Sequence, residues 1–180
     1  MLTLKHRLLV LLGLTLAMAA TRMSHFGSTS LLPDASLAVF LVGGLALQSL
    51  WGFSVLMALA FGVDVLSAKT AVEAGWCLTP AYWGLLPTYG LLWLAGRWMG
   101  RQGRFELLTS GGVSLVAVTG AFLISNAFWY ALSNTVTDLN ALEYATAVAR
   151  YFPPYLGSAF LYLVPLWLAW KLTHRSSLAA

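Results

Sequence analysis

The sequence predicts an all-α integral membrane protein with one transmembrane domain over residues 1–180. Hydrophobic residues make up 59% of the chain and charged residues only 9%, and the mean hydropathy is +0.79. An average soluble domain carries about 25% charged residues. The apolar residues also fall into runs separated by short polar connections, as in a helical bundle in lipid. We expect six membrane-spanning helices, at residues 7–22, 35–48, 50–66, 82–99, 107–133 and 154–171.

The first span follows a basic start that contains Lys5 and Arg7. A basic start before an apolar run is also typical of a secretory signal peptide, but we interpret this segment as a retained helix. Gly13, Ala17 and Thr21 recur every four residues and form one stripe of small side chains. Such a stripe lets another helix approach closely in lipid. Internal packing and the docking of a partner protein both explain it.

The second and third spans come from one apolar run over residues 35–63. As a single helix this run would be more than about 40 Å long, whereas the hydrocarbon core of a bilayer is about 30 Å thick. We therefore expect a break at residues 48–52. Asp64 follows in FGVDVLS, with apolar neighbours on both sides. An ionisable residue at membrane depth usually marks a site, although an interfacial acid that faces water is the alternative.

The segment between the third and fourth spans, residues 71–82, holds Cys77, the only cysteine. Gly75 and Pro80 flank it and predict a loop. A single cysteine excludes an internal disulfide and a thiolate cluster for zinc or iron-sulfur. Three interpretations stay open: an inert buried thiol, a nucleophile with a remote base such as His25, or an axial ligand of a metal macrocycle.

The last two long spans are separated by a polar stretch over residues 134–150 that we expect to lie outside the bilayer. Within this stretch the apolar residues follow an approximate helical spacing, which predicts a short surface helix. These residues are Leu139, Leu142, Tyr144, Ala145 and Val148.

The distribution of charge predicts the orientation of the chain. With six spans, seven of the ten basic residues fall on one side, namely Lys5, Arg7, Arg97, Arg101, Arg104, Lys171 and Arg175. The positive-inside rule makes this side cytoplasmic, with both termini inside. Five of the six acids fall on the other side, namely Asp34, Asp64, Glu73, Asp138 and Glu143. Five spans would split the basic clusters across the membrane, so we reject that count.

Five candidate residues lie on or next to the outward connections: His25, Asp64, Cys77, Tyr82 and Arg150. Many aromatic residues gather on the same side, and an aromatic belt at the membrane surface explains most of them. The short spans leave room for a pocket beneath the outward loops. No phosphate-binding loop or nucleophile elbow occurs, so ATP hydrolysis and the commoner hydrolase reactions have no support in the sequence.

The motifs around these residues resemble a known family. His25 in RMSHFGS, Asp64 in FGVDVLS, Cys77 and Tyr82 in GWCLTPAYW, and Arg150 in VARYFPP look like the BtuM-type cobalamin-binding branch of the S-components of energy-coupling factor (ECF) vitamin transporters. The similarity covers nearly the whole chain. Its specificity rests on the cysteine loop, because many membrane families share six spans.

The resemblance implies a protein of the bacterial inner membrane that captures a corrinoid, cobalamin, from the periplasm and releases it inward. In that family a separate membrane scaffold with two ATPases provides the energy, and the first helix meets it, which would make Gly13, Ala17 and Thr21 the docking stripe. Asp64, Tyr82 and Arg150 would bind the substrate.

A thiolate or an imidazole suits cobalt. We therefore expect Cys77 as one axial ligand, and His25 either as the other or as part of the pocket wall. If the thiolate of Cys77 displaces cyanide from cyanocobalamin, Cys77 also alters the vitamin chemically. A haem-binding membrane redox protein that uses Cys77 and His25, and a membrane thiol enzyme with Tyr82 or His25 as acid or base, remain the alternatives.

Overall fold

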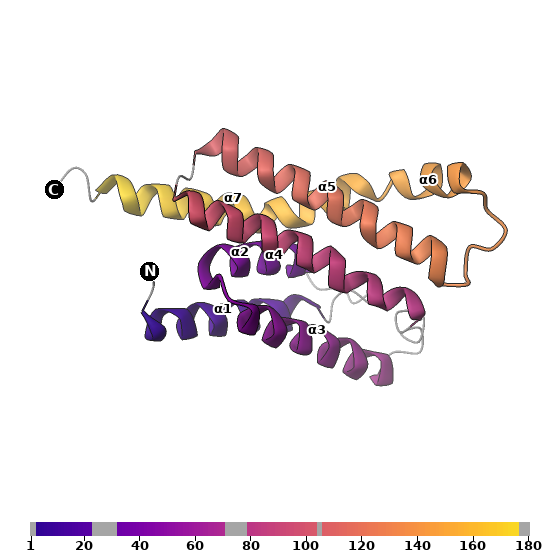
Figure 1. Cartoon of the computed structure of the whole chain (residues 1–180), viewed down its shortest axis with the longest axis horizontal. Coiled ribbons are helices and arrows are strands. Elements are labelled where there is room, and N and C mark those ends of the chain that lie inside the picture. The colour runs from indigo at the N-terminus through magenta and orange to yellow at the C-terminus, as the bar shows by residue number, and fades with distance from the viewer. Residues whose placement is uncertain (1–2, 23–31, 71–78, 104–105, 177–180) are drawn as a thin grey trace.

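The computed structural model describes residues 3–22, 32–70, 79–103 and 106–176, and within these ranges all regular structure is helical (Figure 1). The elements, in chain order, are α1 (Leu4–Arg22), α2 (Ser36–Leu47), α3 (Leu50–Thr70), the 3₁₀ helix η3 (Pro80–Gly84), α4 (Leu85–Gln102), α5 (Leu107–Leu132), α6 (Ala141–Ala149) and α7 (Phe152–Ser176).

Four described helices, α1, α3, α5 and α7, are long and apolar enough to cross a membrane. Their apolar side chains are largely exposed, for example Leu108 at 88% and Val116 at 72% on α5. Apolar surface of this extent on a helix is typical of contact with lipid. The structure therefore supports a multi-pass membrane protein. Helix α2, with 12 residues, is apolar but shorter.

Helix α2 forms the centre of the bundle. It is apolar all round, and nine of its 12 residues are buried, as expected for a helix enclosed by others. It packs against α4 at van der Waals distance between backbones. A Cβ atom on Gly44 would overlap the carbonyl of Trp93, and one on Gly96 would overlap the carbonyl of Leu41. Phe40 and Trp93 fill the adjacent core and are almost fully buried.

The predicted break between the second and third spans is confirmed at Gln48. Helix α2 ends at Leu47, α3 begins at Leu50, and Gln48 between them has a left-handed backbone with φ of 54°. A residue with a left-handed backbone commonly ends a helix, because the chain then leaves the helical path. The side-chain amide of Gln48 donates to the carbonyl of Leu45 at 3.2 Å.

The helices cover the remaining predicted spans to within a few residues, with four extensions. Helix α1 begins at Leu4 rather than residue 7. Helix α3 continues to Thr70 rather than residue 66, α4 to Gln102 rather than residue 99, and α7 to Ser176 rather than residue 171. The predicted span 82–99 begins as the separate turn η3, because Pro80 starts a tight 3₁₀ turn before α4. Charged and polar residues continue a helix readily outside the bilayer, so apolar runs underestimate helix length.

The predicted surface helix is confirmed as α6, and its start has a capping box. The side-chain oxygen of Asn140 accepts from the backbone N–H of Glu143 at 3.0 Å, and the Glu143 carboxylate accepts from the N–H of Asn140 at 2.9 Å. Reciprocal bonds of this kind satisfy donors that the first turn otherwise leaves free.

The two ends of the bundle differ in character (Figure 1). Helix α1 starts, α4 ends, α5 starts and α7 ends toward one side of the molecule. We call this the basic end, after Lys5, Arg7, Arg97, Arg101 and Lys171. The end of α3, η3 and α6 lie at the other side.

Candidate functional site

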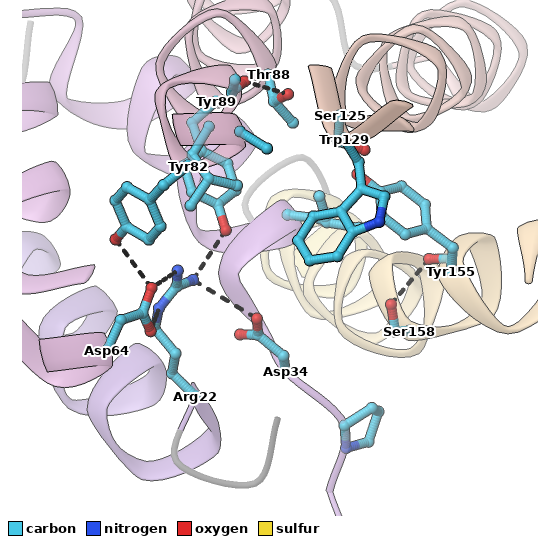
Figure 2. A pocket seen from close by; sticks show the side chains of 15 residues that line it. Arg22, Asp34, Asp64, Tyr82, Thr88, Tyr89, Ser125, Trp129, Tyr155 and Ser158 are labelled. Carbon is cyan, nitrogen blue, oxygen red and sulfur yellow. Dashed lines mark hydrogen bonds and ion pairs between the residues drawn. The ribbon is translucent and has the colours of Figure 1, made fainter. Parts of the chain in front are cut away.

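An open cavity of about 420 Å³ lies at the end of the bundle opposite the basic end. Ligand sites of small molecules commonly have volumes of about 300–1,000 Å³. Every long helix contributes to the wall: the last residue of α1, the starts of α2, α4 and α7, the later parts of α3 and α5, and η3 between them (Figure 2). Its polar and aromatic lining includes Arg22, Asp34, Asp64, Tyr82, Thr88, Tyr89, Ser125, Trp129, Tyr155 and Ser158.

A buried ion pair between Arg22 and Asp64 forms one side of this wall (Figure 2). The guanidinium of Arg22 donates from Nε to Oδ1 of Asp64 at 2.7 Å and from Nη2 to Oδ2 at 2.6 Å. Arg22 is 4% exposed and Asp64 is 5% exposed. The interpretation of Asp64 as an interfacial acid that faces water is therefore wrong. Two parallel bonds of this kind are the strongest arrangement that a guanidinium and a carboxylate adopt.

Arg22 also has acceptors for both N–H groups of Nη1. Its Nη1 donates to the hydroxyl of Ser36 at 2.7 Å and to the hydroxyl of Tyr89 at 2.8 Å. A buried guanidinium is tolerated in an apolar surrounding only when its N–H groups have partners. One arginine thus joins the end of α1 to α2, α3 and α4.

The segment before α2 brings a second carboxylate to the cluster. Asp34 accepts from the backbone N–H of Ser36 at 2.9 Å and from its hydroxyl at 2.6 Å. The other oxygen of Asp34 lies 3.6 Å from Nη1 of Arg22. The Thr21 hydroxyl accepts from the N–H of Ala35 at 3.0 Å and so fixes this segment against α1.

The cluster has more negative than positive charge. Two carboxylates face one guanidinium, so the formal charges of Asp34, Asp64 and Arg22 sum to −1. The side chain of Asp34 is 19% exposed, against 7% for Asp64. The more accessible carboxylate is therefore the one that a ligand in the cavity would meet.

Tyr82 completes the cluster from η3, ahead of the first residue of α4. Its hydroxyl donates to Oδ2 of Asp64 at 2.9 Å. Its backbone N–H bonds to the carbonyl of Thr79 at 2.9 Å, which keeps η3 in a tight turn. Burial raises the pKa of the Tyr82 phenol, and the negative charge of Asp64 raises it further. The phenol is therefore a neutral hydrogen-bond donor at physiological pH.

Of the predicted substrate-binding residues, the structure brings Asp64 and Tyr82 together in the cavity wall. Arg150 does not line this cavity. It follows the last residue of α6, is exposed, and donates to the hydroxyl of Tyr151 at 2.9 Å. His25 and Cys77 lie outside the described residues.

The predicted docking stripe on α1 divides into two parts. Gly13 and Ala17 are exposed, and a Cβ atom on Gly13 would meet nothing within 4 Å. Thr21 is buried at 4% exposure, and its hydroxyl donates to the carbonyl of Ala17 at 2.8 Å. Only the first two positions are free for a partner.

Reasoning from the sequence missed Arg22, Ser36 and Tyr89, and it treated Asp34 only as a charge. The available signal was the position of Arg22, a lone cation at the end of an apolar helix on the acid-rich side of the predicted bilayer. A cation at that depth needs a carboxylate partner, and Asp64 was the candidate at a similar depth.

No protein-family model matches the chain, and no curated protein matches it. In the part of the chain that the structure describes, no group of three or more His, Cys, Asp or Glu side chains could hold a metal ion. The lining of the cavity around Arg22 presents hydrogen-bonding groups and aromatic surface.

Proposed function

We propose that the chain is the corrinoid-capturing S-component of a BtuM-type vitamin transporter in a bacterial inner membrane. One observation carries the proposal. Asp64 and Tyr82, which the resemblance assigns to the substrate, meet at 2.9 Å in the wall of an open cavity. Cys77 precedes Thr79, the first described residue before η3, by two positions.

The chemistry of the cavity supports a ligand of this class. A corrin is a flat ring with apolar edges and many amide arms, so it needs aromatic surface together with separated hydrogen-bonding groups. Trp129 and Tyr155 supply aromatic surface, and Ser125, Ser158 and Asp34 supply polar atoms. A corrinoid is larger than about 420 Å³, so this wall would contact only part of it.

The proposed topology has six crossings, formed by α1, α2, α3, α4, α5 and α7, with α6 in the periplasm. Both termini are then cytoplasmic, because the basic end would face inward by the positive-inside rule. The cavity would open to the periplasm. Gly13 and Ala17 would meet a scaffold that carries two ATPases, because small exposed residues let a partner helix approach.

Cys77 is proposed as an axial ligand of cobalt, and His25 as the second axial ligand or as part of the pocket wall. With cyanocobalamin the step is a ligand exchange without a change of oxidation state. The sulfur of Cys77 forms a bond to cobalt, the cobalt–cyanide bond breaks, and the thiol proton leaves with cyanide as hydrogen cyanide. Arg150 remains a proposed substrate contact from the outward connection after α6.

Calorimetric titration of cobalamin into the purified protein tests the cavity assignment. Trp129→Ala and Tyr82→Phe should weaken binding about 5- to 150-fold, as expected when a buried contact worth about 1–3 kcal/mol is lost. Trp51→Ala is the matched control, because Trp51 is 62% exposed and lies at the start of α3, away from the cavity. Equal affinities in all four proteins would remove the corrinoid from this cavity.

A further inference from the structure

A second cavity, of about 530 Å³, lies toward the basic end. Helices α5 and α7 form its sides, and α2 and α4 complete it. Its wall is almost wholly apolar and includes Leu41, Leu45, Met99, Phe160, Trp167 and Trp170. It shares no lining residue with the cavity around Arg22.

Small residues on α5 create this space. Ser110, Gly111 and Ser114 line the cavity, and a Cβ atom on Gly111 would meet nothing within 4 Å. Gly120, further along α5, behaves differently, because a Cβ atom there would lie 2.7 Å from Leu91. The glycine in the cavity therefore leaves room for another molecule, whereas Gly120 allows two helices to approach.

The cavity is bordered by exposed apolar residues. Leu107 is 59% exposed, Val164 is 47% exposed and Leu166 is 50% exposed, and all three line it. In a membrane-spanning bundle such side chains face the acyl chains of the bilayer. An apolar cavity does not hold water well and takes up apolar molecules, so the adjacent lipid is the natural occupant.

Positive charge lies beside the apolar wall. The ammonium of Lys171 is 4.7 Å from the ring centre of Trp167, which lines the cavity. Arg101 lies in the last turn of α4, which ends at the same end of the bundle as α7 (Figure 1). In the described chain neither cation has a carboxylate within ion-pair distance. Ser110 adds a buried hydroxyl without a hydrogen-bond partner among the described residues.

We infer that this cavity binds one acyl chain of an acidic phospholipid, with the headgroup phosphate held by Lys171 and Arg101. The charge of these two residues complements the headgroup, and the apolar wall between α5 and α7 complements the chain. Bound lipid would fill the space between α5 and α7. This inference is independent of what the other cavity binds.

Native mass spectrometry of the protein in a neutral detergent tests the inference. The probes are phosphatidylglycerol and phosphatidylcholine with identical acyl chains, so that only the headgroup differs. We expect one tightly retained phosphatidylglycerol per chain. Lys171→Gln should reduce the preference for phosphatidylglycerol about fivefold, the effect of one basic side chain beside acidic lipid. Lys69→Gln removes the same charge from the end of α3 and should bind as the wild type does.

Gly111→Leu places a side chain in the empty space and should abolish retention of both lipids. Gly62→Leu is its control, because Gly62 is an exposed helical glycine whose added Cβ also meets nothing within 4 Å. Equal retention of the two lipids by the wild type, or unchanged binding in Gly111→Leu with native helix content, would overturn the inference. If Gly111→Leu does not fold, the headgroup comparison between wild type and Lys171→Gln decides the matter.

Discussion

Replacing Asp64 with leucine removes the carboxylate that pairs with the buried guanidinium of Arg22 at 2.6 Å and leaves it the longer carboxylate contact, with Asp34 at 3.6 Å. Two of the four hydrogen bonds from Arg22 disappear, and the hydroxyl of Tyr82 loses its acceptor. Removing one partner of a buried ion pair costs about 3–5 kcal/mol, because the other charge stays in a medium of low dielectric constant. Arg22→Met should cost a similar amount, since it leaves the buried carboxylate of Asp64 with the hydroxyl of Tyr82 as its donor among the side chains of the cavity wall (Figure 2).

The double variant Arg22→Met/Asp64→Leu should be more stable than either single variant. It removes both charges together, and apolar pairs of similar volume commonly replace a buried ion pair at little cost. What remains is the loss of the hydrogen bonds from Arg22 to Ser36 and Tyr89 and of the bond from Tyr82 to Asp64. The comparison isolates the coupling energy of the pair.

Thermal unfolding in detergent micelles, followed by far-UV circular dichroism, measures these differences. For a chain of this size a loss of 3–5 kcal/mol lowers Tm by roughly 6–20 °C. Arg150→Met is the matched control, because Arg150 is exposed and its hydrogen bond goes to the hydroxyl of its neighbour Tyr151. Its expected effect is within about 0.5 kcal/mol.

Single variants that unfold within about 2 °C of the wild type would contradict the account of the cluster. So would a double variant as unstable as the sum of the two single changes, since independent effects add. Either result would mean that Arg22 and Asp64 do not stabilise each other in the folded protein.

Three further changes test other parts of the account. The raised pKa of Tyr82 means that the fold favours the neutral phenol. Its contribution to stability is therefore present below the unfolded pKa of about 10 and is lost as the pH rises above it. Tyr82→Phe should remove part of the alkaline loss in Tm, and parallel plots of Tm against pH for the variant and the wild type would refute this. Ala17→Leu should leave cobalamin affinity unchanged in calorimetry and reduce cobalamin uptake by cells, whereas weaker binding would mean that Ala17 packs internally. Gly96→Ala should destabilise the bundle by about 1–3 kcal/mol in the same unfolding assay, because the added Cβ meets the carbonyl of Leu41. Gly90→Ala is the control, because its added Cβ meets nothing within 4 Å. Equal Tm values for the two variants would argue against the close contact of α2 and α4.

The order and limits of the helices could be predicted because they depend on local properties. The break at Gln48 followed from comparing the length of an apolar run with the thickness of a bilayer. Helix α6 followed from apolar spacing between two polar connections. These arguments need only neighbouring residues.

The cluster around Arg22 could not be predicted in the same way. Arg22 bonds to Asp64 and Tyr89, which are 42 and 67 residues away in the sequence. Their meeting depends on which helix ends converge, and this is set by packing around α2. The same holds for Thr21, which faces inward because it bonds the segment before α2 instead of continuing the exposed stripe.

The contact between α2 and α4 was also hidden in the sequence. A Cβ atom added to Gly44 or Gly96 would meet a carbonyl of the opposite helix. A Cβ atom added to Gly62 on α3 or Gly90 on α4 would meet nothing within 4 Å. Composition does not distinguish these cases, because a helical glycine looks the same in the sequence whether or not another backbone touches it.

The visible spectrum of the purified protein mixed with cyanocobalamin, with free cyanide measured in parallel, tests the proposed function most directly. We expect a shifted cobalamin spectrum and release of up to one cyanide per protein in the wild type, because a thiolate of Cys77 would replace cyanide on cobalt. Cys77→Ser should show neither change. An unshifted spectrum in the wild type, or the same shift and the same cyanide release in Cys77→Ser, would contradict the proposal that Cys77 binds the cobalt of a captured corrinoid.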